Sequence, residues 1–464
     1  MLIFPLIYLI SFVMAVREVY KGKAEGILLF FIFGLSMYTT AMSVSFMLGL
    51  KSFIPFFQFF KELLVLSVLA LNIATLKYRP RFHLIDYAIL AFFIYTLVYA
   101  ILPIGQQGFS ARLLAFKSTS FYIVVYFTGR LFDPKTIYIN KYFNYIVLLT
   151  IAAGAVLCVE VMRHQQLQLF TGYTDYCYYF FNIEPSGIFG LSTTFDSDSG
   201  LRRFASFFNN PLEHAAATLL ALSIIGALYT RDDNKFKPNS VGLLALGASF
   251  LSILFALSRA PLAGYFLIIY VYALITKKKF ITNTVHAGVG LGLIYVIYLF
   301  TQFESNNNSG LIAVLLNTID FSDPSSVGHL VQWVEGILSM IAHPLGLGLG
   351  TSGRVAGSLG ENVGGENQFI IIGVQAGIIA LFLYLAIYIM FVKASLKWLN
   401  KLKGKERKVC MAVLLIKVGF FIPMLTSEVE SSSYLSYMDW FLSGLFISMI
   451  MYPVQPQLQP VNDN

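Results

Sequence analysis

The chain has 464 residues, of which 57% are hydrophobic and 12% are charged, and its mean hydropathy is +0.72. A soluble domain carries about 25% charged residues, so this composition excludes an ordinary soluble protein. The formal charge of +8 is spread over short loops rather than gathered in one block, so nucleic acid is not an expected partner. The three cysteines, Cys158, Cys177 and Cys410, lack metal-ligand spacing and do not suggest a disulfide framework.

Apolar stretches of nearly membrane-spanning length recur along the whole chain. About 20 apolar residues cross a hydrocarbon core as a helix, and backbone in lipid must satisfy its own hydrogen bonds. The alternation typical of outer-membrane barrel strands is not seen. The sequence therefore predicts an all-α polytopic membrane protein with about 12–13 transmembrane helices. The expected spans are 2–16, 25–48, 53–75, 84–103, 113–129, 143–161, 211–229, 240–257, 262–276, 284–301, 368–391, 409–425 and 437–453.

The loops between these spans differ in charge. Six of them hold 22 of the 32 Lys and Arg residues, and by the positive-inside rule they face the cytoplasm. The two long loops, 162–210 and 302–367, then face the opposite side. The basic loops are 17–23, 77–83, 130–141, 231–237, 277–279 and 393–408. The expected organisation is N-terminal helices over 1–161, a loop over 162–210, central helices over 211–301, a large loop over 302–367, C-terminal helices over 368–453 and a disordered polar tail over 454–464.

Three polar clusters fall on the side of the long loops. The first is the sequence RRFASFFNNP, which begins at Arg202, and the second is ALSRAP, which places Arg259 in a tight turn. The third runs from AHPLGLGLGTSGR, which ends at Arg354, to Glu366 and Asn367 at the start of span eleven. Two guanidinium groups can neutralise a diphosphate whose lipid tail stays in the bilayer. A partly desolvated carboxylate can act as a general base on a hydroxyl.

The order of these motifs resembles that of the O-antigen ligase and polymerase superfamily. The matching patterns are R-x-x-x-x-F-x-N-P before a span, S-R in a short turn, H-P-x-G-x-G in a large loop, and E-N-x-F-I followed by G-I-I-A-L. The similarity extends over roughly residues 201–390. It implies a GT-C-like glycosyltransferase bundle in the bacterial inner membrane, with an active site on the periplasmic face and a glycan linked to undecaprenyl pyrophosphate as substrate.

The resemblance also implies roles for individual residues. Arg203 and Arg259 match the arginines that hold the carrier pyrophosphate. Glu366 stands where the ligases have histidine, and an acidic residue there resembles the polymerase branch more than the ligase branch. The family's glycine after the first arginine is Ser206 here, a change that we expect to be tolerated.

Structural roles are the alternatives for these residues. Arg202 and Arg203 could be interfacial anchors that extend toward lipid headgroups. Arg259 could form an ion pair or clamp carbonyl groups in its turn. Glu366 could be a surface carboxylate favoured by a helix dipole.

The remaining candidates for substrate binding, besides Arg202 and Arg354, stand at helix starts. Asn210 and Asn367 are typical of residues that begin helices. His214, one turn into span seven, is an alternative base.

Charged residues also stand inside the spans. Lys61 and Glu62 in span three and Lys417 in span twelve are expected to line the bundle interior. They could extend a cavity for the carrier or the sugar, or could pair between helices. The tyrosine-rich stretch 170–181 could stack on sugar rings or could form an interfacial aromatic belt.

These features predict a polymerase that joins lipid-linked repeat units into O-antigen, capsular or exopolysaccharide. Metal and nucleotide cofactors are not expected, because the pyrophosphate already activates the donor. A chain-length regulator and a flippase are the implied partners. A ligase that attaches the glycan to lipid A-core or protein, and a glycolipid flippase, are the alternatives; inverted repeats typical of transporters are not apparent.

Overall fold

The computed structural model describes residues 1–76, 80–196, 200–302, 324–359 and 362–451. Side chains are not described at 289, 292–302, 324–326 and 359. The expected polar tail over 454–464 lies outside the described residues, as does the 303–323 part of the large loop.

The fold is an all-α bundle, as predicted, and every expected span coincides with a helical segment. Within the described ranges no β-strand forms beyond two isolated bridges. Among the described residues, eight helical segments are long and apolar enough to cross a membrane, and the segments Ser240–Phe255 and Arg259–Ile275 are apolar but shorter. The second span is irregular, because α2 (Ile27–Leu29) is followed by a π-helical turn (Phe30–Gly34) before α3 (Tyr38–Met47). The helices that match the other expected spans are α1 (Ile3–Tyr20), α4 (Ile54–Ala74), α5 (Leu84–Ile101), α6 (Phe109–Arg130), α7 (Ile139–Arg163), α9 (Pro211–Tyr229), α10 (Ser240–Phe255), α11 (Arg259–Ile275), α12 (Lys279–Gln302), α16 (Gln368–Leu399), α17 (Gly404–Met424) and α18 (Ser433–Met451).

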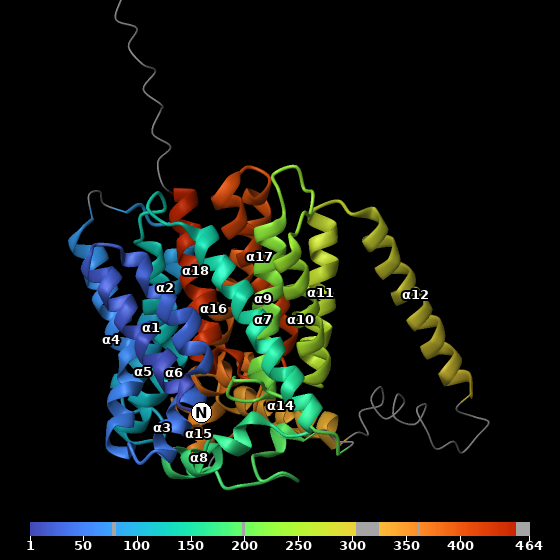
Figure 1. Cartoon of the computed structure of the whole chain (residues 1–464). Coiled ribbons are helices and arrows are strands. Elements are labelled where there is room, and N and C mark those ends of the chain that lie inside the picture. The colour runs from blue at the N-terminus through green and yellow to red at the C-terminus, as the bar shows by residue number, and fades with distance from the viewer. Residues whose placement is uncertain (77–79, 197–199, 303–323, 360–361, 452–464) are drawn as a thin grey trace, which may run out of the picture.

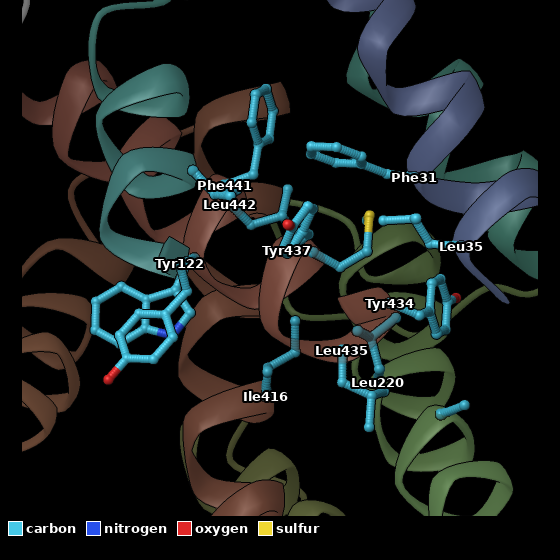
Figure 2. Close-up of a cluster of buried hydrophobic side chains, with 14 of the residues drawn as sticks. Phe31, Leu35, Tyr122, Leu220, Ile416, Tyr434, Leu435, Tyr437, Phe441 and Leu442 are labelled. Carbon is cyan, nitrogen blue, oxygen red and sulfur yellow. The ribbon is translucent and has the colours of Figure 1, made fainter. Parts of the chain in front are cut away.

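The last helix, α18, lies at the centre of the core. Its apolar face contacts the N-terminal span through Phe31 and Leu35, and it also contacts α9 and α17 (Figure 2). Against α6 the two backbones approach closely at Gly129 and Gly444, where an added methyl group would collide with the facing helix. Small residues at a helix crossing allow this approach. One continuous core therefore joins the two ends of the chain.

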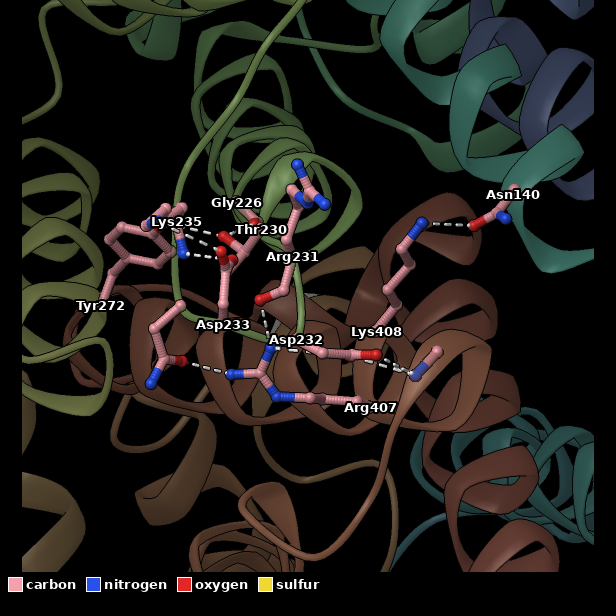
Figure 3. Close-up of polar contacts among 12 residues, drawn as sticks. Asn140, Gly226, Thr230, Arg231, Asp232, Asp233, Lys235, Tyr272, Arg407 and Lys408 are labelled. Carbon is pink, nitrogen blue, oxygen red and sulfur yellow. Dashed lines mark hydrogen bonds and ion pairs between the residues drawn. The ribbon is translucent and has the colours of Figure 1, made fainter.

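Two sets of loops lie at opposite ends of the bundle (Figure 1). At one end, three of the basic loops meet. Arg407 donates to the Arg231 carbonyl at 2.6 Å, and Lys408 donates to Asn140 Oδ1 at 2.9 Å (Figure 3). At the other end lie three helices of the long loops, α8 (Tyr173–Phe181), α14 (Pro324–Ala342) and α15 (Gly353–Leu359). This is the separation that the charge pattern predicts.

Lys417 forms an ion pair between helices. Its Nζ lies 2.6 Å from Asp439 Oδ2 of α18, and both side chains are buried. The ammonium also lies 4.6 Å from the centre of the Trp440 ring. Of the two alternatives for Lys417, the structure therefore favours pairing between helices.

Candidate active site

Arg203 lies beside the turn that carries Arg259. Arg203 Nε donates to the Ala256 carbonyl at 3.0 Å, and the neighbouring Phe204 N–H donates to the Phe255 carbonyl at 3.3 Å. Arg259 is exposed and begins α11, three positions after Ala256. Segment 203–204 thus runs beside the α10–α11 turn. We call this pair, Arg203 and Arg259, the arginine turn.

Buried polar groups of α7 fix the segment that follows Arg203. The Glu160 carboxylate accepts the N–H groups of Ser206 at 2.8 Å and Leu167 at 2.7 Å. Gln168 Nε2 donates to the Ser206 carbonyl at 2.9 Å. Ser206 has a φ of 52°, in the left-handed region that glycine adopts most easily. A glycine would adopt this conformation with less strain than serine does.

The start of α9 completes this segment. Asn210 Oδ1 accepts the Glu213 N–H at 2.9 Å and so caps the helix. The His214 ring is 1% exposed, stacks on Phe208 with centroids 5.3 Å apart, and has Nδ1 3.3 Å from the Phe204 carbonyl. Asn210 therefore has the helix-starting role that its position predicts, and His214 packs inside the bundle.

Arg202 lies on the loop side of this segment. Its guanidinium is 4.2 Å from the centre of the Phe189 ring. Its backbone forms an isolated antiparallel bridge with Asp196. These contacts hold Arg202 against the 162–210 loop.

Glu366 and Asn367 stand at the start of α16, beside α14. Glu366 Oε2 is 3.7 Å from His329 Nδ1, and the Glu366 side chain is 52% exposed. Asn367 is buried, and its Oδ1 accepts the N–H groups of Phe369 at 2.9 Å and Ile370 at 3.2 Å. Glu366 is therefore open to a ligand, whereas the Asn367 side chain caps the helix.

The Asn367→Ala variant is expected to lose about 0.5–2 kcal/mol of stability, because two N–H groups at the start of α16 lose their acceptor. Asn367→Asp keeps an acceptor and is the matched control. Thermal unfolding of the purified protein in detergent measures the difference. If Asn367→Ala unfolds at the wild-type temperature but has no activity, the Asn367 side chain contacts the substrate instead.

A second polar group surrounds Arg354. The Arg354 N–H donates to Glu428 Oε2 at 2.8 Å, and Ser432 Oγ donates to Glu213 Oε1 at 2.8 Å. The Arg354 charge acts on both carboxylates, and its guanidinium lies 5.2 Å from the centre of the Phe181 ring. Burial raises the pKa of Glu428, and the Arg354 N–H and charge oppose this rise. We call Arg354, Glu213 and Glu428 the Arg354 cluster.

The Arg354 cluster adjoins the start of α16. The Glu430 N–H donates to Gln368 Oε1 at 3.4 Å, so the loop that carries Glu428 contacts the helix that follows Glu366. Glu428 is not among the site residues that the sequence predicts. The available signal was a pair of carboxylates, SEVESSS, in a short loop on the same side as the long loops.

One curated protein is similar to this chain over two thirds of its length. No family model matches the chain. The chain is similar to a curated O-antigen polymerase from Salmonella muenchen, with 22% identity over 318 residues that cover 67% of this chain and 75% of the relative. The resemblance to the O-antigen ligase and polymerase superfamily is thus supported by a curated relative that carries this name.

Proposed function

We propose that this membrane protein is a glycosyltransferase that polymerises repeat units carried on undecaprenyl pyrophosphate. The product would be O-antigen, capsular polysaccharide or exopolysaccharide, made at the periplasmic end of the bundle after a flippase delivers the units. The observation that carries the proposal is the arginine turn, in which Arg203 donates a hydrogen bond to the carbonyl of Ala256, three residues before Arg259. This turn belongs to the side opposite the basic loops.

In the proposed reaction, a hydroxyl at the non-reducing end of one lipid-linked unit attacks the anomeric carbon of the other. A new glycosidic C–O bond forms, and the bond between the anomeric carbon and the diphosphate breaks. Arg203 and Arg259 stabilise the negative charge that develops on the departing diphosphate. A carboxylate accepts the hydroxyl proton. The donor needs no nucleotide, because its diphosphate is already a good leaving group.

Two carboxylates are candidates for the base. Glu366 matches the family position and is exposed beside His329. Glu428 has a raised pKa, which brings its proton affinity closer to that of a base working near neutral pH. We propose Glu366 as the base because it stands at the position of the matching motif. Glu428 is the second candidate because burial raises its pKa.

Clean deletion of the gene is expected to leave surface glycan as single repeat units in place of a ladder of lengths. Gel separation of the extracted glycan measures this, and the intact gene restores the ladder. Loss of all attached glycan would indicate a ligase. Carrier-linked units retained in the cytoplasmic leaflet would indicate a flippase.

A further inference from the structure

Three charged side chains lie between α4 and α6, away from the arginine turn. Lys117 Nζ of α6 is 2.5 Å from Glu62 Oε1 of α4, and Lys61 Nζ is 3.9 Å from the same oxygen. The Lys61 and Glu62 side chains are 11% and 5% exposed, whereas Lys117 is 47% exposed. We call these residues the lysine cluster. It has two cations and one carboxylate, and therefore carries one net positive charge.

The local contacts leave this charge incompletely compensated. At 3.9 Å, Lys61 is too far from Glu62 for a hydrogen bond. Its ammonium instead lies 4.2 Å from the centre of the Tyr38 ring. A single carboxylate thus serves two ammonium groups.

The cluster lies within the membrane-spanning part of both helices. Lys61 follows the start of α4 by seven residues, and Lys117 follows the start of α6 by eight. At about 1.5 Å of rise per residue, both lie roughly 10–12 Å from the helix ends on the side of the long loops. Lys117 shares a face of α6 with the exposed Leu113 and Leu114. A cation therefore stands beside apolar surface of the kind that faces lipid tails.

A net charge at this depth is costly without a counter-ion. We propose that the lysine cluster binds the diphosphate of a second lipid carrier, with Lys117 and Lys61 donating to it and the polyprenyl chain lying on the exposed apolar side chains of α4 and α6. A diphosphate attached to a lipid supplies both the anion and the tail that this surface accommodates. Exposed Phe59 and Leu66 stand one turn before and after Glu62 on α4.

This assignment rests on the proposed function. A polymerase holds two lipid diphosphates, one on the donor and one on the acceptor, whereas a ligase with a different acceptor holds one. Helix α4, which carries Lys61 and Glu62, and helix α11, which begins at Arg259, lie on opposite sides of the bundle (Figure 1). The acceptor glycan would extend from the lysine cluster toward the donor.

The test is the number of undecaprenyl diphosphate molecules that the full-length protein binds. The protein is placed in phosphatidylcholine nanodiscs, and bound carrier is counted by native mass spectrometry. The wild type is expected to bind two molecules, Lys117→Met one, and Lys117→Arg two. Lys51→Met is the matched control, because it removes a lysine at the same end of the bundle, and it is expected to bind two.

The Arg259→Ala variant is expected to bind one molecule, and its combination with Lys117→Met none. Two molecules bound to Lys117→Met would overturn the assignment. Displacement of the second molecule by an equal amount of phosphatidylglycerol would also overturn it, because the site would then bind anionic lipids in general. Thermal unfolding confirms that each variant is folded. We expect Lys117→Met to fold, because Glu62 keeps Lys61 as its ion-pair partner. The number of bound carrier molecules does not depend on the glycan phenotype of the deletion. Failure of the second carrier site and failure of the proposed polymerase function can therefore be told apart.

Discussion

Replacing Arg259 with alanine is expected to lower the rate of polymer formation by about 10²–10³-fold, the usual cost of removing one donor that stabilises charge in a transition state. The guanidinium is exposed at the first position of α11, so its loss should leave the fold intact. Purified protein with lipid-linked repeat units gives the rate, and the ladder in cells gives the same result qualitatively.

Two variants make the Arg259 experiment specific. Arg259→Lys keeps the charge but loses the two-pronged donor, so it should recover only part of the rate. Arg231→Ala removes an exposed arginine from the opposite end of the bundle and should retain the full rate. A normal ladder from Arg259→Ala would remove this residue from the mechanism.

The Glu428→Gln variant is expected to lose both rate and pH dependence if Glu428 is the base. Burial raises the pKa of this carboxyl group. The reactive carboxylate is therefore lost as pH falls through that raised pKa, and the wild-type rate should rise with pH over a range above the ordinary carboxyl pKa of about 4.3. Glutamine keeps the size and removes the basicity, so the rate should fall by about 10²–10⁴-fold and this rise should disappear.

Glu366→Gln is the paired experiment, because it makes the same chemical change at the other candidate. A large loss in Glu366→Gln with a normal pH profile in Glu428→Gln would assign the base to Glu366. The reverse result would assign it to Glu428 and leave Glu366 as a partner of His329. Rate measurements on both variants across the same pH range decide between them, and near-normal rates in both would place the base elsewhere.

The fold could be predicted in outline because lipid imposes a strong constraint. Backbone in hydrocarbon must form helices, so hydropathy alone located a helical segment for every expected span. The distribution of Lys and Arg separated the two sets of loops, and the structure places these at opposite ends. The irregular second span and the helices α8, α14 and α15 of the long loops were not predicted, because the expectation rested on long apolar runs, and these loop helices are either short or interrupted by polar residues.

The candidate site could be predicted only in part. Motif order selected Arg203, Arg259 and Glu366, and helix-start chemistry correctly described Asn210 and Asn367. Glu428 was missed, because nothing in the sequence indicates that residue 428 meets the N–H of residue 354.

The sequence by itself determined the helical class, the spans and the two polar ends, because these follow from how each segment interacts with lipid and water. Only the tertiary structure decided the partners of the charged side chains. Lys417 is paired with Asp439 across two helices, whereas Lys61 and Lys117 share a single carboxylate. The reason is that a local segment fixes its own backbone, but the charge that neutralises a buried ion comes from whichever helix packs beside it.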